Sequence, residues 1–234
     1  MNIKKYFSLS LPTKEGSAFL KILAMLLMTV DHVGFILFPG ILWLRILGRL
    51  AFPIFAYQFG VSVKKTKHLE KMGGNLFIFA LISQITFWSV NRWDFRQLSI
   101  FFTLFLAWLI IFFYKKIENK ILKFLAIMPI FIFLLLPIFV ISFPVVDYGL
   151  YGVLLLLCFT VLLEDPIMLN LSFTFLTLSY CFLTGGFVQA FCLLAVFLFY
   201  LRISFKKRFA NLYYYAYYPV HLTILALLSK TLLK

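Results

Sequence analysis

The sequence is dominated by apolar stretches that are long enough to cross a lipid bilayer as helices. Such a helix needs about 20 mostly apolar residues, with a range of roughly 17–25. The predicted spans are residues 19–38, 41–63, 74–90, 98–114, 121–143, 148–163, 166–183, 186–201 and 211–229. We therefore expect an all-α membrane protein, a single polytopic bundle of about nine transmembrane helices (eight to ten), with residues 1–234 forming one domain.

Composition excludes the main soluble classes. Residues of the AVILMFWYC set make up 64% of the chain and charged residues only 13%, whereas an ordinary soluble domain is about half apolar and a quarter charged. The chain has too little polar surface for a soluble enzyme, a disordered chain or a disulfide scaffold. Cys158, Cys181 and Cys192 lie in apolar runs without metal or redox spacing, so we expect small buried side chains and no metal site.

Two local signals refine the predicted helices. Glu164 and Asp165 form a short acidic break, and Pro166 is suited to the first position of a new helix. Pro129 and Pro137 fall inside the fifth predicted span and predict kinks there.

The basic residues predict the orientation in the membrane. The chain has 22 basic and 8 acidic residues, a net charge of +14. Sixteen basic residues fall on one predicted side: Lys4, Lys5, Lys14, Lys21, Lys64, Lys65, Lys67, Lys71, Lys115, Lys116, Lys120, Lys123, Arg202, Lys206, Lys207 and Arg208. Four fall on the other side: Arg92, Arg96, Lys230 and Lys234. The positive-inside rule then predicts a cytoplasmic N-terminus and an outside C-terminus, and the excess charge needs no nucleic-acid partner.

Apart from Lys21 and Lys123 near the ends of their spans, five charged or histidine side chains lie inside predicted spans: Asp31, His32, Arg45, Arg49 and His221. A charged group at the bilayer centre costs about 2.5–3.5 kcal/mol on insertion scales, so each such residue is a functional candidate. A very short turn joins the first two spans, which makes them antiparallel neighbours. We therefore expect the Asp31 carboxylate to lie near both guanidinium groups.

Two interpretations of the charged group remain open. Asp31 and one arginine can form a buried ion pair that only fixes the two helices. One carboxylate offsets only one guanidinium, however, so Arg45 and Arg49 together favour binding of an anion or a carbonyl oxygen. Gly48 lies between the arginines and allows close helix approach.

The histidines have similar alternatives. His32 can form a helix–helix hydrogen bond, or it can exchange a proton at neutral pH. His221 follows a proline in a tyrosine-rich span and is a second candidate for catalysis. Weaker candidates for substrate or cofactor binding are Gln58, Gln84, Asp147 and Tyr217.

The polar blocks of this chain resemble the TraX family of integral membrane proteins. The matching segments are LLMTVDHVGFILFP, LRILGRLAFPIFAY, LISQITFW, DYGLYG and YYPVHLTIL, which extend from about Lys21 to Leu228. The resemblance implies a multi-pass protein of the bacterial cytoplasmic membrane, associated with amino-terminal acetylation of conjugative pilin. It also implies a relation to a wider superfamily of membrane acyltransferases, which take acetyl groups from cytoplasmic acyl-CoA.

From the resemblance we expect an enzyme that transfers an acetyl group from acetyl-CoA to an amine or a hydroxyl. The acceptor would be a pilin or peptide terminus or a glycan, reached in or across the membrane lipid. His32 is the expected base, Asp31 orients it or pairs with an arginine, and His221 is the second candidate catalyst. Arg45 or Arg49 would stabilise the oxyanion or an anionic part of CoA.

Two functions of other classes remain. A transporter or flippase for small or lipid-linked substrates would use Asp31, His32 and Arg45 as a relay, and it would show inverted repeats, which we do not find in the sequence. An assembly factor would use the buried polar groups only for helix packing.

Overall fold

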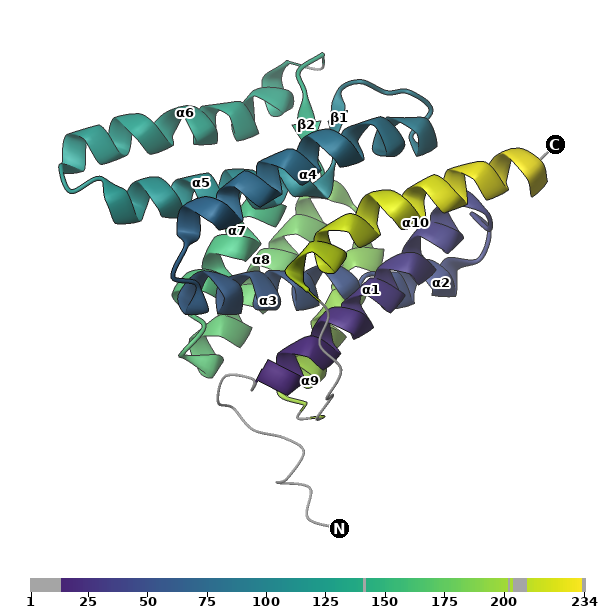
Figure 1. Ribbon diagram of the computed structural model, residues 1–234, viewed down its shortest axis with the longest axis horizontal. Helices are drawn as coiled ribbons and strands as arrows, with labels where there is room; N and C mark the ends of the chain where they lie inside the picture. Colours follow the sequence, from purple (N-terminus) through teal and green to yellow (C-terminus); the bar gives the residue numbers. More distant parts are fainter. Residues whose placement is uncertain (1–13, 141, 202, 204–209, 233–234) are drawn as a thin grey trace, which may run out of the picture. The chain divides into compact units, whose positions relative to one another are not determined.

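The computed structural model describes residues 14–140, 142–201, 203 and 210–232. The described residues are almost entirely helical (Figure 1), which confirms the predicted helical membrane class. Five helices in the described part of the chain are long and apolar enough to cross a membrane: Gly16–Ile36, Leu42–Lys65, Leu69–Val90, Lys120–Phe139 and Pro166–Thr184. Part of the predicted charge asymmetry rests on Lys4, Lys5, Arg202, Lys206, Lys207, Arg208 and Lys234, which lie outside the described residues.

The chain forms two compact units, which we call the first and second units. The first unit comprises Met1–Lys65 and Cys158–Lys234, and the second unit comprises Thr66–Leu157. The helices of the first unit are α1 (Lys14–Ile36), α2 (Leu42–Gly48), α3 (Ala51–Lys65), α8 (Pro166–Thr184), the 3-10 helix η2 (Phe187–Leu194), α9 (Ala195–Phe199) and α10 (Asn211–Leu232). The second unit contains α4 (Leu69–Val90), β1 (Gln97–Leu98), α5 (Ile100–Lys116), α6 (Lys120–Phe139) and β2 (Val145–Val146). Helix α7 (Gly149–Val161) continues from the second unit into the first.

Aromatic rings form the core of the first unit. Tyr57 of α3 stacks on Phe199 of α9 with ring centroids 5.0 Å apart, and Phe159 packs edge-on against Phe199 at 5.3 Å. Phe173 of α8 packs against Phe159 at 5.4 Å. All four side chains are almost completely buried, so they fix α3, α7, α8 and α9 against one another.

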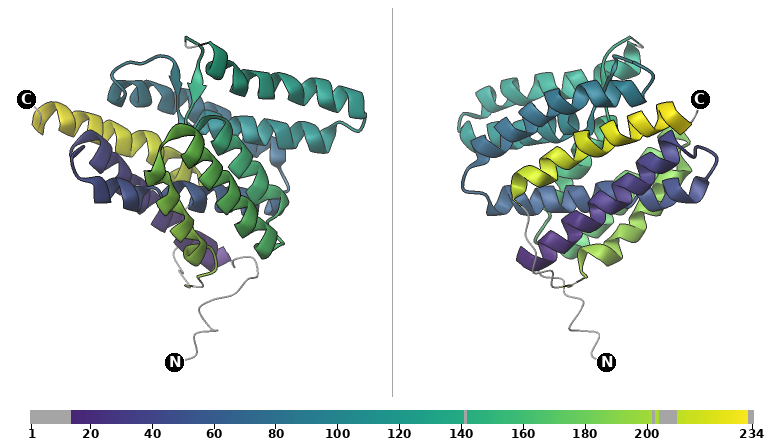
Figure 2. Two further views of the ribbon diagram at one scale, coloured as in Figure 1. Left: turned by 180° about the vertical axis from the view of Figure 1, so that it is seen from behind. Right: turned by 45° about the vertical axis from the view of Figure 1, so that its right-hand side comes forward.

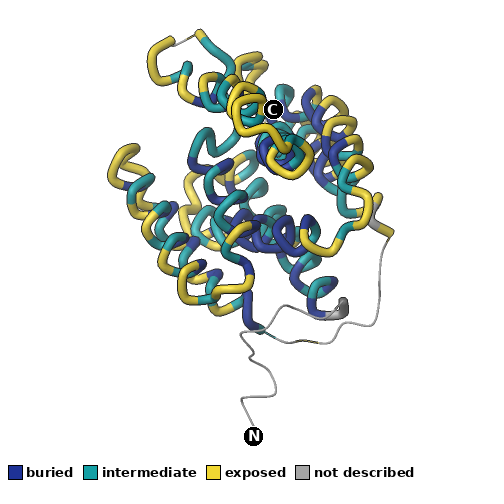
Figure 3. The backbone as a smooth tube through the Cα atoms, turned by 90° about the vertical axis from the view of Figure 1, so that its left-hand side faces the viewer, coloured by how far each residue is buried: buried dark blue, intermediate teal, exposed yellow. Residues whose placement is uncertain are grey.

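Outer helix faces are apolar. On α8, Phe175, Phe182 and Leu183 are 70%, 75% and 88% exposed, and buried and exposed residues alternate along the individual helices (Figure 3). Large exposed apolar surfaces of this kind mark contact with lipid or with a partner. In a chain with several helices of membrane-spanning length, lipid is the natural contact.

The second predicted span is broken into α2 and α3 at Arg49 and Leu50. Pro53 has no N–H group and cannot donate to the carbonyl oxygen of Arg49 one turn earlier, so the regular helix is interrupted there. The Leu50 N–H donates instead to the carbonyl oxygen of Leu47 at 3.2 Å, which tightens the backbone into a 3-10 turn. This break places Arg49 at the junction of two helices.

Contacts within the first unit show the relative directions of its helices. Along α1 and α10, Lys21 lies over the ring of Tyr214 at 4.8 Å, and further along both helices His32 contacts His221. The two helices therefore run parallel, side by side (Figures 1 and 2). Their shared direction agrees with the predicted first and ninth spans, which are both odd-numbered.

The second unit shows one departure from the all-α expectation. Strands β1 and β2 pair in parallel, with Gln97 opposite Val145 and Leu98 opposite Val146. The pair is only two residues long and joins the loops that follow α4 and α6. The sequence carries no alternating pattern there, so this pairing depends on contacts made after the helices have packed.

The local helix signals had different outcomes. Asp165 caps α8, because its side chain accepts from the Met168 N–H at 3.0 Å. Pro166 begins that helix, which confirms the predicted boundary. Helix α6 continues through Pro129 and Pro137 as one element, and the kinks predicted at these prolines stay a prediction.

Candidate functional site

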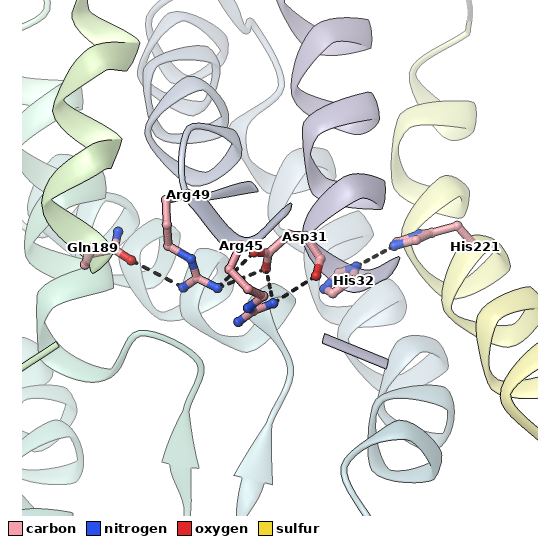
Figure 4. A network of polar contacts seen from close by, with 6 residues as sticks. All are labelled: Asp31, His32, Arg45, Arg49, Gln189 and His221. Atoms are coloured by element: carbon pink, nitrogen blue, oxygen red, sulfur yellow. Dashed lines mark hydrogen bonds and ion pairs between the residues drawn. The ribbon is translucent and has the colours of Figure 1, made fainter. Parts of the chain in front are cut away.

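Asp31 of α1 binds both arginines of the α2–α3 region (Figure 4). Arg49 Nη2 lies 3.0 Å from each carboxylate oxygen of Asp31. Arg45 Nη1 lies 2.9 Å from Asp31 Oδ2 and also donates to the Asp31 backbone carbonyl at 2.9 Å. The side chains of Asp31, Arg49 and Arg45 are 13%, 16% and 26% exposed. The cluster thus brings two positive groups to one carboxylate with little access to solvent.

A glycine allows this close approach. Gly48 packs so tightly against α1 that an added Cβ would lie 2.6 Å from the Asp31 Cα and would also overlap the Asp31 side chain. A side chain at position 48 would therefore push α2 away from α1. Arg45 and Arg49 therefore flank, in the sequence, the close contact between Gly48 and Asp31. This contact brings both guanidinium groups to the Asp31 carboxylate.

Gln189 joins the cluster from η2 and was not predicted from the sequence. Its Oε1 accepts a hydrogen bond from Arg49 Nη1 at 3.3 Å (Figure 4). The residue is 4% exposed. A glutamine in an apolar run carries no charge and forms no motif, so its low exposure in the fold is the only signal that distinguishes it.

His32 and His221 form a direct hydrogen bond between α1 and α10. His32 Nδ1 and His221 Nε2 are 2.7 Å apart, and the two rings stack at 4.9 Å between centroids. His221 Nδ1 lies 2.8 Å from the backbone carbonyl oxygen of Tyr217. His221 is buried, and His32 is half-buried.

These contacts determine which ring nitrogens carry hydrogen when both rings are neutral. A carbonyl oxygen only accepts, so His221 Nδ1 must carry the hydrogen that it donates to Tyr217. His221 Nε2 then has a lone pair and accepts from His32 Nδ1–H. The remaining nitrogen, His32 Nε2, is therefore left with a lone pair and can take a proton from another group.

Tyrosines of α10 enclose the histidine pair. The Tyr217 ring stacks on His221 at 5.0 Å, and its hydroxyl lies 2.6 Å from the Thr29 hydroxyl on α1. The Tyr218 ring packs edge-on against His32 at 5.9 Å and against His221 at 5.7 Å. Tyr217 was predicted as a binding residue; the structure places it beside His221, where its backbone and ring both orient the imidazole.

Six side chains form a row from η2 to α10. Figure 4 shows Gln189 at one end, then Arg49, then Arg45 with Asp31, and finally His32 and His221 at the other end. The row combines a proton-accepting nitrogen with guanidinium groups that can stabilise negative charge. This combination is suited to acyl transfer, in which a nucleophile loses a proton while a carbonyl oxygen gains negative charge.

Gln58 lies elsewhere in the first unit. Its Oε1 accepts from the Ser17 hydroxyl near the start of α1, 14 residues before Asp31, which corresponds to roughly 21 Å along a helix. The structure therefore does not bring Gln58 into the row. Its Nε2 is buried and has no partner among the described residues.

Gln84 and Asp147 belong to the second unit and hold its backbone together. Gln84 Nε2 donates to the Gln97 carbonyl at 2.8 Å, and Gln84 Oε1 accepts from the Ser99 N–H at 2.9 Å. The Asp147 carbonyl accepts from the Thr103 hydroxyl at 2.6 Å, and its N–H donates to Leu98. These contacts orient the β1–β2 pair, and a role of either residue in substrate binding stays a prediction.

The fold and this row define a helical integral membrane protein with a largely shielded cluster of ionisable residues. The TraX protein family model matches residues 16–229, and the chain belongs to the TraX family. An uncharacterized protein of Rickettsia prowazekii (strain Madrid E) is 28% identical over 130 residues, which cover 56% of this chain and 49% of that protein. The match thus spans about half the length of that relative. No solved structure matches this chain.

Proposed function

We propose that this protein is a membrane-embedded acetyltransferase that uses cytoplasmic acetyl-CoA as donor. The observation that carries the proposal is the hydrogen-bond chain from His32 through His221 to the Tyr217 carbonyl. These hydrogen bonds leave a proton-accepting nitrogen on His32. The residue before it is Asp31, whose carboxylate binds two guanidinium groups. The TraX family membership supports the same chemistry through the family's association with pilin acetylation.

In the proposed reaction, His32 Nε2 removes the proton from an acceptor amine or hydroxyl. The acceptor atom attacks the thioester carbonyl carbon, and the C=O electron pair moves to the oxygen. When the tetrahedral intermediate collapses, the C–S bond breaks and the CoA thiolate takes the proton from His32. During the first step His221 Nε2 accepts from His32 Nδ1–H and stabilises the positive charge on the ring.

The two arginines receive different roles. Arg45 donates to the carbonyl oxygen of the peptide bond that joins Asp31 to His32, so its guanidinium lies close to the backbone of the base. We propose that Arg45 stabilises the negative charge that forms on the thioester oxygen. Arg49 is more buried and is held by Asp31 and Gln189, so it serves to fix α2–α3 against α1. Asp31 thus positions the arginines, and His221 orients His32.

The proposal includes one transmembrane acyltransferase-like domain with nine spans in the bacterial cytoplasmic membrane. The N-terminus would be cytoplasmic and the C-terminus outside, as the distribution of basic residues indicates. The parallel direction of α1 and α10 supports an odd-numbered final span. The acceptor class is an amine or hydroxyl of a peptide, pilin or glycan, at or within the membrane.

A transporter is the second candidate, with Asp31, His32 and Arg45 as a relay. It would need the carboxylate to change partners, whereas Asp31 binds two arginines and also supplies a backbone acceptor to Arg45. Because the Asp31 carboxylate already pairs with both arginines, it favours a fixed catalytic site over a relay whose ion pairs rearrange during transport.

The proposal is tested with purified protein in vesicles that contain acetyl-labelled acetyl-CoA on the side of the basic loops. Candidate acceptors are a short peptide with a free N-terminus, a simple primary amine and a soluble glycan. An acetyltransferase attaches the label covalently to one of them, as mass spectrometry would detect. A transporter moves the label without chemical change, and an assembly factor does neither; either result contradicts the proposal.

A further inference from the structure

Gln189 places a buried hydrogen-bond donor next to the guanidinium of Arg49. Because a guanidinium only donates, Gln189 Oε1 must face Arg49, and the amide nitrogen Nε2 must point away from it. Nε2 is shielded from solvent and has no hydrogen-bond partner among the described residues. A buried donor without an acceptor is costly in a folded protein, and each such group in a native structure calls for an explanation.

The amide is firmly held in this position. Gln189 lies on η2, whose eight residues form an unusually long 3-10 helix. Cys192 of the same helix is fully buried and lies 3.8 Å from the Thr177 hydroxyl of α8. With η2 packed on α8, Nε2 can turn away from this position only if Oε1 gives up its hydrogen bond to Arg49.

The surroundings indicate the chemistry of a partner for Nε2. The partner must supply an acceptor atom, because Nε2 only donates. Arg49 Nη2 contacts both carboxylate oxygens of Asp31, so we assign the unmatched positive charge of the cluster to Arg45, which lies on the side of Arg49 away from Gln189 (Figure 4). A neutral carbonyl oxygen therefore fits better than a phosphate. Binding of Oε1 to a cation also polarises the amide and strengthens its N–H groups as donors.

We propose that Gln189 Nε2 binds an amide carbonyl oxygen of a substrate, at the end of the row opposite His32 and His221 (Figure 4). This inference rests on the proposed function for the identity of the substrate. Two reactants carry amide carbonyls: the pantetheine arm of acetyl-CoA and the backbone of a peptide acceptor. In either case the substrate is held at η2 while its reacting group extends across α1 toward the base.

The test separates binding from turnover. Equilibrium binding of CoA, pantetheine and a short acceptor peptide is measured for the wild type and for Gln189→Leu. Thr177→Val is the matched control, because it removes a buried hydroxyl from the η2–α8 contact and leaves Gln189 itself unchanged. Gln189→Glu keeps an oxygen that can accept from Arg49 but has no N–H donor. It therefore tests the donor in a variant that retains the contact with Arg49.

If the donor arm binds at Gln189, both Gln189 variants weaken CoA and pantetheine binding about tenfold, the size of one hydrogen bond. They leave a simple acetyl thioester without amide groups equally reactive. If the peptide acceptor binds there, only peptide binding weakens. The inference is overturned if neither ligand binds the wild type, if the variants bind both ligands as the wild type does, or if Thr177→Val weakens binding equally. Altered binding without any acetyl transfer by the wild type would contradict the proposed function and leave this subsite in place.

Discussion

Asp31 and His32 are consecutive residues of α1, yet their side chains belong to different parts of the row. The Asp31 carboxylate contacts Arg45 and Arg49, whereas the His32 imidazole is bound to His221 on α10. Adjacent helical residues point about 100° apart, so one dipeptide holds α2–α3 on one side and α10 on the other. The imidazole of His32, which we propose as the base, is therefore oriented by a histidine and not by the neighbouring carboxylate.

The first prediction concerns the orientation of His32 by His221. His221→Leu removes the acceptor for His32 Nδ1–H, and we expect the kcat of acetyl transfer to fall on the order of 10–100-fold, because the base loses its tautomer and its orientation. His221→Gln keeps an acceptor oxygen and should restore most of the rate. Equal rates in both variants would show that the histidine contact only packs the helices.

The second prediction concerns the approach of α2 to α1. Gly48→Ala places a methyl group against the Asp31 backbone, and we expect it to destabilise the fold by about 1–3 kcal/mol, as overpacked contacts do. Gly40→Ala is the matched control, because an added Cβ there has nothing within 4 Å. Thermal unfolding in detergent measures both variants. A similar midpoint for both would mean that the helices can separate at little cost.

The third prediction compares the two ways of unbalancing the charged cluster. Asp31→Asn leaves two guanidinium groups facing each other, and we expect a loss of about 2–4 kcal/mol, slightly below the range for fully buried pairs because the groups are partly exposed. Arg45→Gln leaves the Asp31–Arg49 pair and should cost less. The double variant should be more stable than Asp31→Asn alone, since it relieves the repulsion. Additive losses in denaturant unfolding would contradict this coupling.

The fourth prediction concerns topology. Lys67 and Arg96 lie in loops that follow successive predicted spans, so cysteines introduced there one at a time, in a chain whose three native cysteines are replaced by alanine, should lie on opposite sides of the membrane. A membrane-impermeant maleimide applied from outside should label Arg96→Cys and Lys230→Cys in intact cells. Lys67→Cys should react only after the membrane is opened. Labelling of Lys67→Cys in intact cells would reverse the orientation or change the number of spans.

Much of the fold could be predicted from the sequence because bilayer-spanning helices are specified locally. Long apolar runs, the Asp165–Pro166 boundary and the arginine spacing in α2–α3 are all local signals. The break at Arg49 was harder to predict from the sequence, since Pro53 can either kink or interrupt a helix. The β1–β2 pair was not predicted, because it depends on side-chain contacts from Gln84 and Thr103 that only the packed helices provide.

The candidate site was predicted in part for the same reason. Asp31 with two arginines followed from the short turn between neighbouring helices. The contact between His32 and His221 joins residues 189 positions apart in the sequence, and sequence alone offered it only as a hypothesis. Gln189 was missed because a neutral amide in an apolar segment has no distinguishing pattern. Gln58 of α3 contacts Ser17, near the end of α1 opposite to Asp31, and therefore lies outside the row.

The most direct test of the account is the initial rate of acetyl transfer from acetyl-CoA in His32→Ala, compared with the wild type and with His68→Ala. His68 precedes α4 in an exposed loop and controls for the loss of any histidine. We predict that His32→Ala lowers the rate by about 10²–10⁴, the contribution of a general base, while His68→Ala retains the wild-type rate. Transfer at the wild-type rate by folded His32→Ala would contradict the claim that this imidazole is the base.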